Sequence, residues 1–279
     1  MKVIEEFENN NKILNYKPNV INSKINFKGK NNILICEENV ILKDSYISFE
    51  GSNSIIYLSS NDNYYFLNIT TNNNSVLFID ENCYFNSQLY IILSESKNVF
   101  IGKNCLFSIG IWMRLADPHL IYDVDNMRRI NVSKSIYIGD HVWIGQDVML
   151  LKGTQIGSGS IIGAKSLVSN KKIHSNSIWG GNPAKKIRNN IFFDSETAHN
   201  YKNEETEKSM MYVDRKWIYE HDKETLGFEY LGMIKDKKTM NDKIEFLIEI
   251  RNNKSHNRFH VKEIKNKKKR WKIINRLFF

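Results

Sequence analysis

Residues 136 to 188 read IYIGDHVWIGQDVMLLKGTQIGSGSIIGAKSLVSNKKIHSNSIWGGNPAKKIR, and they set the organisation of the chain. An aliphatic residue recurs every six positions: Ile138, Ile144, Leu150, Ile156, Ile162 and Val168. Glycine follows four of them: Gly139, Gly145, Gly157 and Gly163. A six-residue period does not fit an α-helix. It predicts a solenoid of short strands, each directing one aliphatic side chain toward the axis.

The residues around these aliphatic positions predict the shape of each coil. Glycine permits a tight corner, where a Cβ would clash or φ must turn positive. Small or β-branched residues occupy the place four positions after each aliphatic residue: Val142, Val148, Thr154, Ser160 and Ser166. Such residues let successive coils stack closely. We therefore expect a triangular prism with one short strand on each side.

Four stretches closely resemble the hexapeptide-repeat acyltransferases: DPHLIYD, IGDHVWIG, IGSGSIIGAKSLV and GGNPAKKIR. The resemblance covers about the middle third of the chain, and it is specific because the stretches occur together. It implies a left-handed parallel β-helix, acetyl-CoA as cosubstrate, no metal, and a homotrimer with active sites between adjacent prisms. The similar enzymes include O-acetyltransferases of bacterial surface glycans.

We expect a mainly β fold in three parts. Residues 1–30 form an N-terminal lead-in, residues 31–188 the β-helix, and residues 189–279 a mixed or helical appendage. A weaker six-residue grid precedes the main repeat at Ile35, Ile41 and Ile47, and residues 114–135 interrupt it as a protruding loop. Thr239 is a candidate helix cap, with Ile244, Leu247 and Ile248 on one helical face. This helix should pack on the β-helix or on a neighbouring subunit.

Composition favours a soluble cytoplasmic protein. Hydrophobic residues make up 41% of the 279 positions, and neither a signal-like segment nor an apolar run of membrane-spanning length occurs. The three cysteines, Cys36, Cys83 and Cys105, show no metal-binding spacing and should be reduced thiols inside the prism. Two of them fall on fifth hexad positions.

The net charge of +9 is concentrated at the C-terminal end of the sequence. Residues 262–279 carry +7 and the rest of the chain only +2, so the charge gives no general argument for nucleic-acid binding. The segment ends in RWKIINRLFF, where Trp271, Ile274 and Leu277 or Phe278 would share a helical face. Three interpretations stay open: peripheral contact with an anionic membrane, packing on another subunit, and a solvated end.

His119 is the candidate catalytic base. It lies in the protruding loop, in the context where the similar surface-glycan enzymes carry a catalytic histidine. An imidazole can accept the proton of a hydroxyl near neutral pH. Asp117 or Asp123 would orient the ring, and the sequence does not choose between them.

Trp143 is the second candidate. At the sixth place of a hexad, its side chain should point away from the narrow prism. From there it could cover the pantetheine arm, and its indole N–H could hold the acetyl oxygen. Plain packing between subunits is the alternative. His141, a fourth-place residue, is expected on the surface.

The resemblance also supplies cofactor-binding positions. In the family, CoA lies between two prisms, contacts the backbone of successive coils and meets basic residues with its phosphates. The matching positions here are Trp143, Gly145, Gln146, Gly163, Ala164, Ser169, Lys171, Lys185 and Arg188.

The expected function is acetyl-CoA-dependent O-acetylation of a sugar hydroxyl by direct transfer. DPHLIYD and the repeat after it look most like enzymes that decorate capsule or lipooligosaccharide, and an anionic, sialic-acid-containing glycan is the favoured acceptor. One alternative is a small acceptor such as serine, a free sugar or an antibiotic. Another is an inactive β-helix that only binds glycan.

Overall fold

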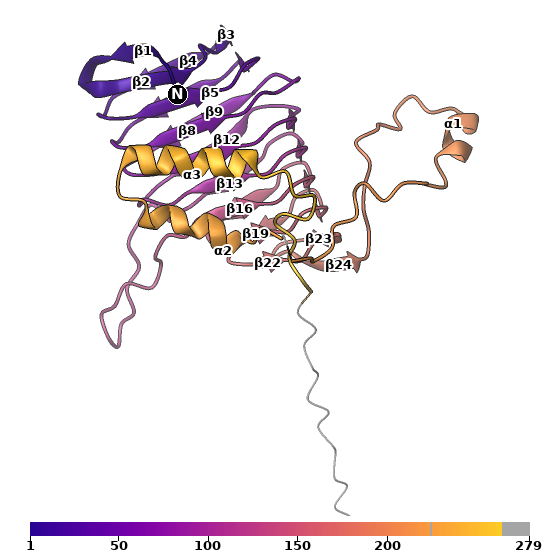
Figure 1. The fold of residues 1–279 in the computed structure, drawn as a ribbon. Coiled ribbons are helices and arrows are strands. Elements are labelled where there is room, and N and C mark those ends of the chain that lie inside the picture. Colours follow the sequence, from indigo (N-terminus) through magenta and orange to yellow (C-terminus); the bar gives the residue numbers. More distant parts are fainter. Residues whose placement is uncertain (224, 264–279) are drawn as a thin grey trace, which may run out of the picture.

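A computed structural model describes residues 1–223 and 225–263 and confirms the parallel β-helix (Figure 1). Each coil contributes strands to three sheets that form the sides of a prism. A loop, a helical layer and an extended arm project from it. All but the first two residues of the basic tail, including the predicted helical face at Trp271, lie outside the described residues.

Parallel pairing between successive coils builds the sheets. The nine-stranded sheet contains β1 (Val3–Phe7), β2 (Asn11–Asn15), β5 (Ile33–Cys36), β8 (Ile55–Leu58), β10 (Val76–Ile79), β13 (Val99–Ile101), β16 (Ile136–Ile138), β19 (Gln155–Ile156) and β22 (Lys172–Ile173). The seven-stranded sheet contains β4 (Lys24–Phe27), β7 (Tyr46–Phe49), β9 (Leu67–Thr71), β12 (Leu89–Leu93), β15 (Trp112–Arg114), β18 (Met149–Leu151) and β21 (Leu167–Val168). The six-stranded sheet contains β11 (Tyr84–Phe85), β14 (Leu106–Phe107), β17 (Trp143–Ile144), β20 (Ile161–Ile162), β23 (Ser177–Gly180) and β24 (Lys185–Asn189). A short sheet pairs β3 (Asn19–Ile21) with β6 (Ile41–Lys43).

The solenoid begins before the predicted boundary at residue 31. Strands β2, β3 and β4 already pair in parallel with β5, β6 and β7 of the next coil. Only β1 and the 3₁₀ turn η1 (Glu8–Asn10) precede this ladder, and β1 pairs antiparallel with β2. The expected lead-in is therefore mostly the first coil, in which asparagine-rich corners replace the glycine-marked hexads.

Coil length changes along the axis, as the pairing register shows. Ile33 lies beside Ile55 of the next coil, whereas Tyr137 lies beside Gln155, so the coils after the loop are shorter than those before it. The longer coils enclose aromatic as well as aliphatic side chains, whereas the shorter coils enclose aliphatic ones. Buried inside the longer coils are Phe49, Tyr65, Phe85 and Phe107; inside the shorter ones are Ile144, Leu150, Ile156, Ile162 and Val168.

Close stacking explains three of the four hexad glycines. A Cβ on Gly139, Gly145 or Gly157 would lie 2.6–2.7 Å from a neighbouring coil, whereas a Cβ on Gly163 would have room. Positive φ is not the reason, because other residues take the left-handed corner position: Asn104, His141, Asp147, Gly159 and Lys165.

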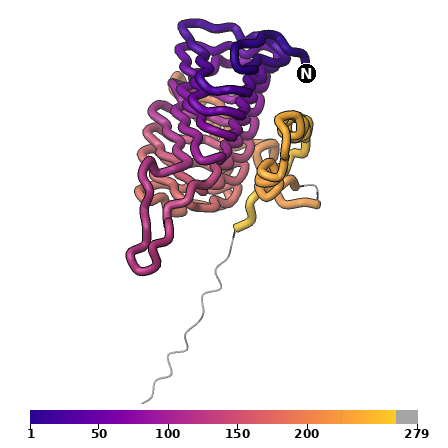
Figure 2. Tube along the Cα trace, turned by 90° about the vertical axis from the view of Figure 1, so that its left-hand side faces the viewer, coloured from indigo at the N-terminus to yellow at the C-terminus, as the bar shows by residue number. Residues whose placement is uncertain are grey.

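Helices cover the outer face of the nine-stranded sheet (Figures 1 and 2). They are α2 (Phe228–Leu231), η2 (Gly232–Asp236) and α3 (Met240–Asn252). Tyr57, Phe78 and Phe100 of the sheet are buried in one cluster with Phe246 and Leu247 of α3. Thr239 caps α3 by accepting from the N–H of Asp242, as predicted, and the appendage packs on its own β-helix. The short helix α1 (Asn203–Lys208) lies in the projecting arm.

A buried ion cluster fastens the appendage to the prism. The Arg258 guanidinium donates to Asp140 through Nε (2.6 Å) and Nη2 (2.9 Å), and it also pairs with Asp80. At most 1% of each of these three side chains is exposed. Burial raises the pKa of Asp80 even though Arg258 opposes the shift. Arg258 therefore joins a long coil to a short one.

The three cysteines are free and buried, which confirms the prediction of inward-facing thiols. No helix in residues 1–223 and 225–263 is long and apolar enough to cross a membrane.

Candidate active site

One line of side chains on the six-stranded sheet organises the site. Residues directly opposite each other in neighbouring strands point to the same face. The pairing register aligns Tyr84, Leu106, Trp143, Ile161, Ile178 and Arg188 in one line along the prism. We call these six residues the outer column. Trp143 is 41% exposed in its middle, as expected for a side chain that points away from the axis.

The expected cofactor corner lies beside Trp143. Gly145 and Gln146 follow β17, and Gly163 and Ala164 stack on them one coil further along. The N–H of Lys165 donates to the carbonyl of Gln146 at 2.7 Å, and a Cβ on Gly145 would lie 2.7 Å from the N of Ala164. Ala164 and Gln146 are exposed, so a ligand can approach the backbone here.

Of the basic residues predicted to bind the cofactor, Arg188 is the one that the pairing register places in line with Trp143. It pairs with Ile178 and so joins the outer column, three strand spacings or about 15 Å from Trp143. Lys185 pairs with Gly180, and both basic side chains are exposed. Lys171 donates to the carbonyl of Ala184 at 2.6 Å, which ties it to the GNPA turn. Ser169 follows β21 at a different corner, between the seven- and nine-stranded sheets.

The loop between β15 and β16 carries His119 on the surface and projects from the prism (Figure 2). The buried Asn131 holds the loop together: its amide donates to the carbonyl of His119 at 2.7 Å and accepts from the N–H of Ile121 at 3.0 Å. Arg129 anchors the loop to Glu95 with two hydrogen bonds of 2.6 and 3.1 Å. Sequence reasoning missed Asn131, because only its burial distinguishes it from the many other asparagines.

The two carboxylates proposed to orient His119 have other partners in a single chain. Asp117 accepts from Lys152 at 2.5 Å and from Asn131 at 3.1 Å, and the Lys152 hydrogen bond lowers the pKa of Asp117. Asp123 accepts from the backbone N–H groups of Asp125 and Asn126. Within residues 1–223 and 225–263, neither carboxylate contacts the His119 imidazole.

A single chain also separates His119 from Trp143. The loop leaves the corner between the seven- and nine-stranded sheets, whereas Trp143 belongs to the six-stranded sheet. In a triangular prism this corner lies opposite that sheet. Ser169 lies at the same corner as the loop, and Gly145 and Ala164 lie at an edge of the Trp143 sheet. The predicted residues therefore form two groups on opposite sides.

His141 is not on the surface, so that expectation was wrong. Its ring lies between Phe193 and Trp217, with centroid distances of 3.9 and 3.6 Å, and only 1% of the residue is exposed. Its Nε2 is 2.9 Å from the carbonyl oxygen of Phe193. Burial lowers the pKa of His141 to about 4, although nearby backbone carbonyl groups oppose the shift. His141 thus holds the segment after β24 against the prism, beside Trp143.

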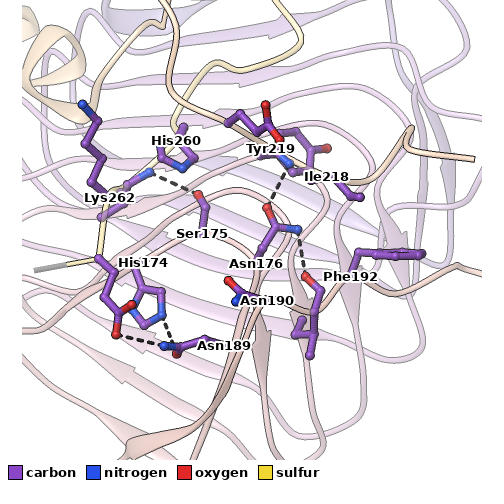
Figure 3. A pocket seen from close by; sticks show the side chains of 14 residues that line it. His174, Ser175, Asn176, Asn189, Asn190, Phe192, Ile218, Tyr219, His260 and Lys262 are labelled. Atoms are coloured by element: carbon purple, nitrogen blue, oxygen red, sulfur yellow. Dashed lines mark hydrogen bonds between the residues drawn. The ribbon is translucent and has the colours of Figure 1, made fainter. Parts of the chain in front are cut away.

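A pocket of about 610 Å³ lies where the appendage meets the last coil (Figure 3). Several of its polar side chains are already engaged. Asn189 Oδ1 lies 2.9 Å from His174 Nε2, and Asn189 Nδ2 donates to Glu263 at 2.9 Å. Asn176 donates to the carbonyls of Ile191 and Trp217. None of the site residues predicted from the sequence lies in its described lining. We interpret this pocket as a structural junction.

The parallel β-helix, with its hexad repeat and interrupting loop, is similar to the hexapeptide-repeat acyltransferases, as the sequence resemblance predicted. The family Bacterial transferase hexapeptide (six repeats) matches residues 135–170. A solved structure of the polySia-specific acetyltransferase NeuO is similar at 28% sequence identity and a TM-score of 0.59; the match covers 69% of this chain and 90% of NeuO.

A second solved structure shares the fold. It is that of the polysialic acid O-acetyltransferase OatWY, with 24% identity and a TM-score of 0.53, and the match covers 70% of this chain and 98% of OatWY. No curated protein sequence matches the chain. The left-handed β-helix and the acyltransferase class predicted from the sequence are confirmed.

Proposed function

We propose that this protein is an acetyl-CoA-dependent O-acetyltransferase that modifies a sialic-acid-containing bacterial surface glycan, as in capsule or lipooligosaccharide. The outer column is the observation that carries the proposal. It places the exposed Trp143 beside the Gly145–Ala164 corner and ends at Arg188, a span comparable to an extended pantetheine arm. The similarity to NeuO supports the acceptor class.

In this proposal CoA follows the outer column from Arg188 to Trp143. The apolar side chains of Ile161 and Ile178 would contact the pantetheine arm, and Arg188 with Lys185 would meet the phosphates. Trp143 would cover the thioester and exclude water from it. Acetyl-CoA is available in the cytoplasm, where we place the reaction.

His119 acts as general base. Its imidazole takes the proton of the sugar hydroxyl, and the hydroxyl oxygen attacks the thioester carbonyl. The tetrahedral intermediate collapses as the C–S bond breaks, the acetyl group remains on the sugar, and the CoA thiolate takes the proton from the imidazolium. Asn131 positions His119 through the backbone of the loop. No metal takes part in this mechanism.

We further propose a homotrimer, because the two groups of site residues lie on opposite sides of one prism. Three prisms around an axis would set the His119 corner of one subunit against the Trp143 sheet of the next. The loop exposes apolar side chains that such packing would cover, including Leu120, Ile121, Tyr122 and Val124. In the trimer, Asp117 or Asp123 can still serve as the orienting carboxylate.

Thiol release from acetyl-CoA tests the function. We expect release with sialic acid oligomers or polymers, and little with serine, free neutral sugars or antibiotics. His119→Ala should lower kcat by at least about 100-fold with little change in acetyl-CoA binding. Serine- or antibiotic-dependent release would favour the small-molecule alternative. Glycan binding without any release would favour the inactive scaffold.

A further inference from the structure

A groove runs along the outer column from Trp143 toward the N-terminus. Two adjoining cavities of about 560 and 770 Å³ form it, and they share six lining residues: Tyr84, Asn86, Leu106, Ser195, Thr197 and His199. The floor is the upper half of the outer column, Tyr84, Leu106 and Trp143. Two strand spacings separate Tyr84 from Trp143, so the floor is about 10 Å long, and Asn63 extends the lining beyond it.

The chain that follows β24 forms the wall of this groove. Ser195, Thr197 and His199 line it together with Lys216 and Trp217. Both segments of the wall are fixed to His141, because the rings of Phe193 and Trp217 stack on its two faces. Asp194 joins the segments by accepting from Trp217 Nε1 at 3.2 Å and from the Tyr212 hydroxyl at 2.9 Å. The Lys216 ammonium lies 4.4 Å from the centroid of the Trp217 ring. The carboxylate of Asp194 is thus engaged, and Lys216 brings a cation to the lining.

The asparagines of the groove differ from the asparagine ladder at one other corner of the β-helix. At that corner, Asn10 donates to Asn31 at 2.9 Å and Asn31 donates to Asn53 at 3.2 Å. In the part of the chain that the structure describes, the side-chain amides of Asn82, Asn86 and Asn104 make no hydrogen bond, although all three line the groove. Each can therefore donate to and accept from a ligand.

We propose that this groove binds the acceptor as a chain of several sugar units, with the unit to be acetylated next to Trp143. Free amides suit sugar hydroxyls, Tyr84 is 46% exposed and offers an aromatic face to a sugar ring, and Lys216 can meet the carboxylate of an acidic unit. The cofactor corner lies on the other side of Trp143, so donor and acceptor would meet there. This inference rests on the proposed function and adds a preference for oligomers over single sugars.

Sialic acid oligomers of one, three and five units test the groove. For the wild type, KM should fall as the acceptor lengthens from one to three units. Tyr84→Ala should raise KM for the trimer and pentamer about tenfold and leave KM for acetyl-CoA and for the single sugar unchanged. Lys216→Ala should act in the same direction. The matched control is Tyr16→Ala, because Tyr16 is 45% exposed and lies outside the groove.

Calorimetric binding of the pentamer to the His119→Ala variant separates this inference from the proposed function. Binding that Tyr84→Ala weakens and Tyr16→Ala leaves intact supports the groove, even if the wild type transfers no acetyl group. The groove is wrong if Tyr84→Ala and Tyr16→Ala bind the pentamer equally, or if the wild type acetylates all three acceptors with one KM.

Discussion

The β-helix contains two kinds of coil, and they differ in width, core and surface. Coils before the loop are longer, enclose phenylalanines among their aliphatic side chains, and present Tyr84 in the outer column with asparagines beside it. Coils after the loop are shorter, enclose aliphatic side chains and present a glycine-lined corner. The His119 loop lies between them. In our account the long coils bind the acceptor, the short coils bind the cofactor, and transfer occurs where they meet.

Arg258 gives the strongest test of how the two kinds of coil are joined. Arg258→Met would leave Asp80 and Asp140 buried without their cation, so we expect a loss of about 3–5 kcal/mol in the free energy of unfolding. Urea denaturation measures it. Arg215→Met is the control, because its pair with Glu220 is exposed and should contribute less than about 1 kcal/mol. Equal losses of unfolding free energy in the two variants would show that the buried ion cluster of Arg258, Asp80 and Asp140 contributes no more than an exposed ion pair.

His141 makes the start of the short coils sensitive to pH. The unfolded chain takes up a proton near pH 6.5, whereas the folded chain does so only near pH 4. Between these values the unfolded state binds more protons, so stability is full above pH 6.5 and falls by about 3 kcal/mol by pH 4.

His141→Asn isolates this effect. Asparagine suits the left-handed backbone at residue 141, as it does at Asn82 and Asn104, and it does not titrate. The variant should be less stable at neutral pH but should lose less stability on acidification. An unchanged difference between pH 6.5 and pH 4 in unfolding measurements would assign the effect to other groups.

The proposed binding of the cofactor by the short coils depends on Lys185 and Arg188, which follow the last of these coils. Arg188→Ala should raise KM for acetyl-CoA about tenfold and largely spare kcat, because it removes a contact made equally in the ground and transition states. Lys185→Ala should act in the same direction but less strongly, since it lies outside the outer column. KM for dephospho-CoA thioesters should rise less on these substitutions if either side chain contacts the 3′-phosphate of CoA. Unchanged acetyl-CoA affinity in both variants would contradict this assignment.

The two kinds of coil also explain what could be predicted from the sequence. The short coils repeat every six residues, so the positions of Ile138 to Val168 already determine their strands, their core and the outward direction of Trp143. The long coils add four residues at the corner between the seven- and nine-stranded sheets, as between Ile91 and Ile101, which shifts the six-residue frame and hid the coil that begins at Asn11. His141 was wrongly predicted to lie on the surface, because its burial depends on Phe193 and Trp217, which lie outside the repeat. Asn131 and Arg258 act through contacts with distant residues.

Mixed trimers test the central claim that each active site combines His119 of one subunit with Trp143 of the next. His119→Ala and Trp143→Ala should each be nearly inactive alone. When the two variants are co-expressed in equal amounts and assemble at random, every mixed trimer should contain one intact site. The mixture should then show about a quarter of wild-type acetyl transfer. A double variant carrying both substitutions, co-expressed with either single variant, should restore nothing. Mixed trimers that form but stay inactive would contradict the account.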